Sequence, residues 1–380
     1  MTITQDMPPE MTPGTDLGDV QGAGSDRRGA SVSRRRRLLR AGILVFFVFY
    51  VILTLLPFYF LFVRTFVSTK DSAELWFWLP PEEEVNMDAE IGNLSIFLNL
   101  DIAKVKEAWG IPATKYVNPR QSLTKVAEKY DIPEETIKNY LRSFGRYNGW
   151  IVLLGNSGFW SSLARTVLVA GVAIIGTNLL GLMTGAGLAG LRFQYQRWIY
   201  AIYLLEVVIP TFLILLPQFI LVSRIQALIP GVANPGLVRD ASQLGALILL
   251  FIKGGALSTM IFTSAIGAIP RELEESAEID GATRWQYIRH ILLPLMKVPI
   301  AGLTVIVLPF YWNSFLYPFI YLDPGNATLQ PFIASFTGQY TTNFRVVYTG
   351  VFVSIIPLVL IYFVFRKWFI SGVLEGAVKG

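Results

Sequence analysis

Six long apolar runs constrain this chain of 380 residues more than any other feature. They cover residues 43–63, 166–191, 198–223, 241–270, 298–322 and 346–365. Each is long enough for a helix to cross about 30 Å of hydrocarbon at ~1.5 Å per residue. Glu206 and Lys253 are the only Asp, Glu, Lys or Arg residues within them. Because a lipid-embedded backbone must satisfy its own polar groups, the runs predict an all-α membrane protein with six transmembrane helices.

The composition fits this class, since 53% of residues are hydrophobic and 16% are charged. The net charge of +5 is attributed to basic cytoplasmic loops rather than to nucleic-acid binding. The absence of cysteine excludes disulfides, thiol catalysis and cysteine-based metal sites. No catalytic or metal-binding residue is therefore expected.

The runs divide the chain into segments. The sequence predicts a disordered cytoplasmic tail, a first transmembrane helix, a partly helical extracytoplasmic insertion, a five-helix core and a cytoplasmic C-terminal tail. The respective boundaries are 1–40, 41–63, 64–160, 161–372 and 373–380. The first apolar run follows arginines as an export signal does, but it is longer than a signal peptide requires and no small-x-small cleavage site follows it, so we expect it to be retained.

Between the fourth and fifth runs lies a polar stretch, residues 270–294, which we call the elbow. Three glutamates near its start favour the positive end of a helix dipole. Gly281 supplies the freedom to end this helix and turn. Thr283, followed three residues later by Gln286, predicts a capped second helix, which Pro294 then limits.

Basic residues predict the orientation. If the N-terminus is cytoplasmic, the two tails and the loops on that side contain 16 Arg and Lys residues, including those of the elbow. The two short outer loops contain only three. We therefore expect a multi-pass protein of the bacterial cytoplasmic (inner) membrane, with both termini and the elbow in the cytoplasm.

The elbow resembles the EAA loop of the membrane subunits of ABC importers. The resemblance rests on a pattern of an acidic residue, a small residue and alanine, followed by a glycine and then by Ile-x-Leu-Pro. The small residue here is Ser276, where the family usually has alanine. The resemblance implies that the elbow sits in a groove of an ATP-binding subunit. It implies a coupling role for Glu275, Ser276, Ala277, Asp280, Gly281, Ala282, Ile291, Leu293 and Pro294.

The core is similar to sugar-importer permeases of the maltose-transporter (MalG) type at residues 187–193, 312–318 and 372–380. Ser314 replaces the usual acid, so no role of that carboxylate carries over. The resemblance implies the type I importer permease fold and import of a sugar or oligosaccharide. The implied partners are a second, MalF-like permease, a MalK-like ATPase dimer, an extracytoplasmic solute-binding protein and membrane lipids, with no nucleic acid.

The sequence has no Gly-Lys-Ser/Thr phosphate loop, so we expect no cofactor on this chain, with ATP and magnesium on the partner ATPase. Charges inside spans are costly. Glu206 and Lys253 therefore either belong to a polar pathway or substrate site, or form a buried structural pair or a contact with the partner permease. Trp312, Asn313 and Tyr317 suit sugar stacking and hydrogen bonding, although packing is the commoner use of aromatic residues.

Residues 120–145 imitate a DNA-binding helix-turn-helix, which leaves a membrane-anchored regulator as the alternative function. The predicted topology places this segment outside the cell. A small helical cap on the outer mouth is therefore favoured.

Overall fold

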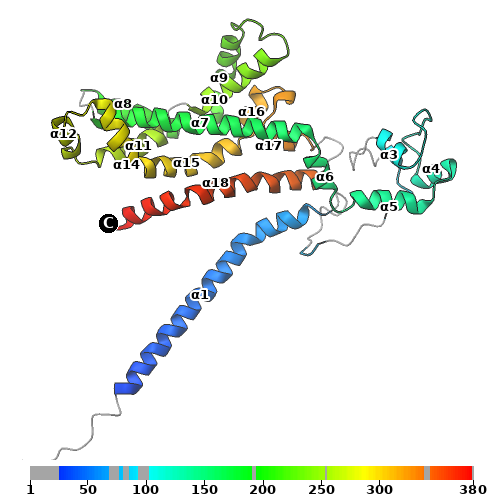
Figure 1. Cartoon of the computed structure of the whole chain (residues 1–380), viewed down its shortest axis with the longest axis horizontal. Coiled ribbons are helices and arrows are strands. Elements are labelled where there is room, and N and C mark those ends of the chain that lie inside the picture. The colour runs from blue at the N-terminus through cyan, green and yellow to red at the C-terminus, as the bar shows by residue number, and fades with distance from the viewer. Residues whose placement is uncertain are drawn as a thin grey trace, which may run out of the picture. The chain divides into compact units, whose positions relative to one another are not determined.

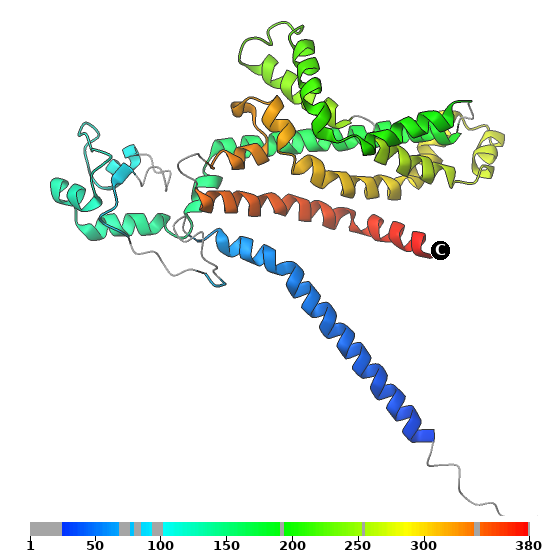
Figure 2. The same ribbon diagram turned by 180° about the vertical axis from the view of Figure 1, so that it is seen from behind.

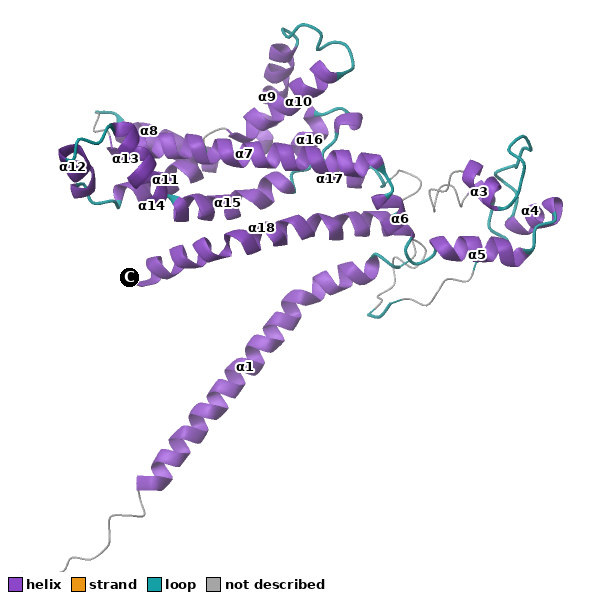
Figure 3. Ribbon diagram, in the orientation of Figure 1, coloured by secondary structure: helices purple, strands orange, loops and turns teal. Residues whose placement is uncertain are grey.

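The computed structural model describes residues 25–67, 77–79, 85–92, 102–190, 194–252, 255–337 and 343–378. In this part of the chain every regular element is a helix, apart from an isolated bridge between Glu90 and Ser122 (Figure 3). The all-α prediction is confirmed. The chain forms two compact units, residues 1–59 and 60–380.

The first unit consists, in its described part, of most of α1 (Ser25–Arg64). Large apolar side chains between Ile43 and Leu55 are 50–65% exposed all round the helix, as suits a helix surrounded by lipid. The helix begins at Ser25, within the segment that the sequence predicts to be a disordered tail. Arginine is a good helix former, and an existing helix extends at little cost. Residues 1–24 lie outside the described residues.

The insertion contains a small helical group built from α3 (Ile102–Ala108), α4 (Leu123–Tyr130) and α5 (Glu134–Phe144). Its own hydrophobic core consists of Ile91, Val105, Trp109, Ile111, Val117, Leu123, Val126, Ala127, Ile137 and Leu141. The helix-turn-helix pattern therefore reflects a real helix pair, α4 and α5, whose apolar faces are used for packing.

The core is organised around α7 (Ser157–Gly190), which begins before the predicted Thr166. Further core helices are α6 (Asn148–Leu154), α8 (Gln196–Val208), α9 (Thr211–Gln226), α10 (Leu237–Ile252), α11 (Ala256–Gly267), α15 (Lys297–Trp312), α16 (Leu316–Tyr321), α17 (Leu329–Ala334) and α18 (Phe344–Val378). Helix α7 packs against α10, α11, α15 and α17, and α15 packs in turn on α18 (Figures 1 and 2).

Three of the apolar runs are not single helices. Three described helices are long and apolar enough to cross a membrane, or up to six if each bent helix pair counts as one span. The predicted spans 198–223 and 241–270 are the pairs α8–α9 and α10–α11, each bent by more than 40°. At the first break Ile209 is extended, as expected for a residue before proline, here Pro210.

The last two spans also differ from their predicted limits. Helix α15 ends at Trp312 rather than at Leu322, and the segment entering it from the elbow is bent by 60°. Helix α18 continues from Phe344 to Val378 through the predicted C-terminal tail, with its membrane-compatible part at residues 344–367. Hydrophobicity therefore located the spans, but it did not locate their ends.

Candidate coupling elbow and translocation pocket

The first helix of the elbow is α12 (Glu272–Ile279), and a glycine turn ends it (Figure 1). Gly281 has φ +78°, a left-handed conformation that favours glycine. The Ala282 N–H donates to Ala277 O at 2.9 Å, and the Gly281 N–H donates to Glu278 O at 3.0 Å. These two bonds form a Schellman motif, which satisfies the last helix carbonyls and fixes the direction in which the chain leaves.

The second helix begins with α13 (Arg284–Tyr287), and the predicted cap is confirmed. The Gln286 N–H donates to Thr283 Oγ1 at 3.3 Å, and the Thr283 N–H donates to Gln286 Oε1 at 2.7 Å. The chain then forms a π-turn over Ile288–Leu292 and continues as α14 (Leu293–Leu295). This helix ends at Leu295, one residue after Pro294, and a bend of 60° follows before α15, so Pro294 lies at the end of the second helix as predicted. A proline disturbs the preceding turn of an α-helix, and the wider π-turn accommodates it.

The elbow has a buried side and an exposed side. Ala277 and Leu292 are each 6% exposed, and Leu292 packs in one cluster with Phe262 and Leu303 of α11 and α15. On the opposite side the apolar side chains of Ile279 and Trp285 are 87% and 66% exposed. The elbow is therefore anchored to its own helices and presents two apolar side chains outward.

The candidate coupling residues are divided between these sides. Glu275, Ser276, Asp280, Gly281 and Pro294 are exposed, whereas Ala277 is buried and Ala282, Ile291 and Leu293 are partly buried. The sequence interpretation missed Ile279 and Trp285. Their signal was available, since both are large apolar residues with polar or charged neighbours on each side in the sequence.

A pocket of about 330 Å³ lies where α10 breaks into α11. Its lining combines aromatic rings, hydroxyl groups and one carboxylate, from Thr177, Glu206, Leu250, Phe251, Gly255, Leu257, Ser258, Leu303, Val307, Phe310, Tyr311, Ser314 and Tyr317. The rings of Phe251 and Tyr311 stack at 5.0 Å, and Tyr317 meets Phe251 edge-on at 5.8 Å. We call this the translocation pocket.

Three polar side chains satisfy the backbone at the helix break. The Tyr311 hydroxyl donates to Phe251 O at 3.0 Å and lies 2.9 Å from Thr177 Oγ1. Glu206 Oε2 accepts a hydrogen bond from the Ala256 N–H, at the first residue of α11, at 2.9 Å. A carboxylate is well placed at a helix N-terminus, where free N–H groups and the helix dipole favour negative charge. A broken helix inside a membrane requires such partners or a water-filled cavity.

The candidate pathway residues separate into two groups. Glu206 and Tyr317 line the translocation pocket. Trp312 is only 2% exposed and donates from Nε1 to Ser354 O at 3.0 Å, so it packs α15 against α18. Asn313 accepts a hydrogen bond from Gln330 outside the pocket, and Lys253 lies outside the described residues. The sequence interpretation missed Thr177, whose only signal was a polar side chain in an uncharged run.

Broken apolar helices around a small, mostly apolar pocket, joined to a capped elbow, are typical of the membrane subunit of a transporter. The family described as "Binding-protein-dependent transport system inner membrane component" matches residues 177–374. This match covers more than half of the chain and includes both the elbow and most of the pocket. The chain therefore belongs to this family of multi-pass membrane proteins.

Several characterised proteins are similar to this chain. The lactose transport system permease protein LacG of Rhizobium radiobacter is 27% identical over 222 residues, covering 58% of this chain and 74% of LacG. The arabinooligosaccharides transport system permease protein AraQ of Bacillus subtilis is 26% identical over 265 residues, covering 70% and 87%. A bacterial ABC transporter involved in alginate import has a similar fold, with a TM-score of 0.55 and 15% identity over 88% of this chain and 98% of that one.

Proposed function

We propose that this chain is one permease subunit of an ATP-driven importer for a neutral sugar or oligosaccharide. It would form half of the translocation pathway together with a second, related permease. The names of the similar permeases, for lactose and for arabinooligosaccharides, support a sugar substrate. The family name supports an extracytoplasmic solute-binding protein as a further partner.

The observation that carries the coupling role is the construction of the elbow. Its first helix ends in a Schellman motif, its second begins with a capping box, and Ile279 and Trp285 project outward. Two fixed helix ends make it stiff, and two exposed apolar side chains suit a groove on an ATPase subunit. When two ATPase subunits close on ATP, such an elbow carries their movement into α11 and α15.

The translocation pocket suits a neutral solute. Among the described residues that line it, Glu206 is the only Asp, Glu, Lys or Arg, and a carboxylate disfavours an anionic substrate nearby. Rings and hydroxyl groups supply apolar faces and hydrogen-bonding groups for a sugar. In this proposal Glu206 both caps α11 and excludes sugar acids and sugar phosphates.

The proposed topology has both termini and the elbow in the cytoplasm and the insertion outside. ATP and magnesium would bind only the partner ATPase. The relatives lend no support to the DNA-binding alternative, and α4 and α5 bury their apolar faces in their own small core.

The test is reconstitution of the transporter with its cognate subunits in proteoliposomes. In Gly281→Pro the ring cannot adopt the φ of +78° and the N–H bond to Glu278 is lost, so uptake should fall while ATP hydrolysis continues. Glu275→Lys, which reverses the charge in the first turn of α12, should have the same effect. Glu135→Lys, the same change in the first turn of α5, is the matched control and should leave uptake unchanged. Normal uptake in both elbow variants would contradict the coupling role.

A further inference from the structure

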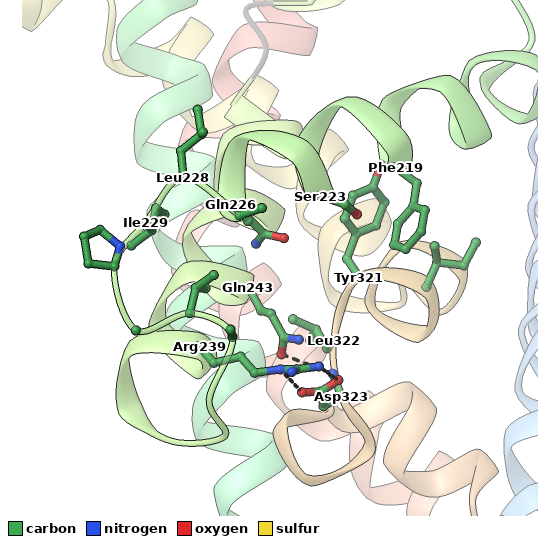
Figure 4. Close-up of a pocket in the computed structure, with 16 residues that line it drawn as sticks. Phe219, Ser223, Gln226, Leu228, Ile229, Arg239, Gln243, Tyr321, Leu322 and Asp323 are labelled. Carbon is green, nitrogen blue, oxygen red and sulfur yellow. Dashed lines mark hydrogen bonds and ion pairs between the residues drawn. The ribbon is translucent and has the colours of Figure 1, made fainter.

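A second pocket, of about 540 Å³, lies between the end of α9, the following loop, the start of α10 and the segment after α16 (Figure 4). We call it the α9–α10 pocket. Its polar side chains are those of Ser223, Gln226, Arg239, Gln243, Tyr321 and Asp323. It shares no lining residue with the translocation pocket. Its volume lies within the range of small-molecule sites, about 300–1,000 Å³.

The charged part of this pocket is internally neutralised. Arg239 donates to Asp323 through two bonds, from Nε at 2.6 Å and from Nη2 at 3.0 Å (Figure 4). Gln243 Oε1 accepts from the backbone N–H of Asp323 at 3.1 Å and so holds the main chain of that residue. Within the described part of the chain, no other Asp, Glu, Lys or Arg lines the pocket. The pocket is thus polar without net charge, which favours a neutral ligand over an ion.

Two buried polar atoms in the lining have no hydrogen-bond partner in the described part of the chain. They are Tyr321 Oη, on a side chain of a residue that is only 5% exposed, and Gln226 Nε2. A buried polar group without a partner costs about 1–3 kcal/mol, so a ligand that pairs with both gains this energy. A hydroxyl group both donates and accepts, and can therefore pair with a phenol and with an amide N–H.

The aromatic residues add an apolar face beside these atoms. The rings of Tyr321 and Phe219 meet edge-on with centroids 5.5 Å apart. A sugar ring has hydroxyl groups around its rim and C–H groups on its faces, which matches this arrangement of polar and apolar groups. A purely apolar ligand would leave both buried polar atoms unpaired.

We propose that the α9–α10 pocket binds one residue of a neutral saccharide, as a subsite separate from the translocation pocket. The α10–α11 pair begins at this pocket and leads to the elbow at its other end, so in the proposed topology the pocket faces the outside. A saccharide would meet this subsite before it reaches the translocation pocket. The proposal rests on the proposed sugar-import function and deepens it.

The test measures saccharide binding to the assembled transporter in lipid nanodiscs without the solute-binding protein. Lactose, raffinose and arabinotriose are the probes. Their binding to the transporter is measured by saturation-transfer NMR. Tyr321→Phe removes only the hydroxyl, and should weaken binding of the preferred probe about 5- to 10-fold. The same variant should unfold at an equal or higher temperature without ligand, because the unpaired hydroxyl is gone. Gln226→Leu is the second variant and should weaken binding similarly.

Tyr116→Phe, on a residue that is 76% exposed in the insertion, is the matched control and should bind like the wild type. Unchanged binding in both pocket variants, or no binding of any probe to the wild type, would overturn the subsite. ATP-dependent uptake of the same sugars by the complete wild-type transporter is measured in parallel. If the transporter takes up a sugar but no probe binds in the nanodisc measurement, only the subsite is refuted. If no sugar is taken up at all, the proposed function is refuted.

Discussion

The contact between α7 and α11 gives the sharpest test of the packing. Of the seven glycines in α7, Gly176, Gly181 and Gly185 lie against α10 or α11 and Gly158 lies against Phe332, whereas Gly171, Gly187 and Gly190 have open space beside them. A Cβ added at Gly185 would lie 2.6 Å from Phe262 Cβ, and 2.9 Å from both Phe262 C and Thr263 N. Two of these three atoms belong to the backbone, so no side-chain rotation relieves the clash and the helices must separate.

We therefore expect Gly185→Ala to destabilise the protein and Gly171→Ala to stabilise it. Alanine gains about 0.8–1.0 kcal/mol over glycine in a helix interior, and this gain applies to both variants. Overpacking costs about 1–3 kcal/mol, and this cost applies only at position 185. The difference between the variants is the clash alone, so it should also be about 1–3 kcal/mol.

The assay measures unfolding of the purified protein in detergent, with the fluorescence of its nine tryptophans as the signal. Gly171→Ala is the matched control because it makes the same change in the same helix with nothing within 4 Å. If Gly185→Ala proves as stable as Gly171→Ala, the close approach of α7 and α11 is wrong.

Three further predictions concern single polar groups. Thr283→Ala removes the cap of α13 and should destabilise it by about 0.5–2 kcal/mol, seen as faster hydrogen exchange in the elbow, whereas Thr283→Ser should retain protection. Glu206→Gln can still accept the Ala256 N–H, so it should unfold like the wild type but transport more slowly if the carboxylate serves the pathway; Glu206→Leu should lose about 1–3 kcal/mol of stability. The hydrogen bonds from Arg239 hold the pKa of Asp323 below its ordinary value of about 3.9. This ion pair therefore stabilises the fold above about pH 3.9, and its stabilisation is lost as the pH falls through the lower pKa of the folded state. The difference in unfolding temperature between wild type and Asp323→Asn should therefore be small at pH 7, since both side chains are over a third exposed, and should vanish in strong acid; a difference that grows in acid would contradict it.

The elbow shows how far local sequence reasoning reaches. Gly281, Thr283 and Gln286 act through bonds to residues within five positions, so their roles follow from spacing. The same reasoning did not predict the π-turn over Ile288–Leu292, because no residue type in the sequence indicates one.

The sequence by itself determined that the chain is an all-α membrane protein with a capped elbow between two of its apolar runs, because hydrophobicity and helix capping act over a few neighbouring residues. Only the tertiary structure decided where a span breaks, which glycines meet a neighbouring helix, and what Glu206 does. The side chains that hydrogen-bond the free backbone groups at the break after α10 are distant in the sequence. Glu206 lies 50 positions from Ala256, and Tyr311 lies 60 positions from Phe251. A backbone group buried in a membrane must find a partner in space, and a linear pattern of residue types does not contain that information.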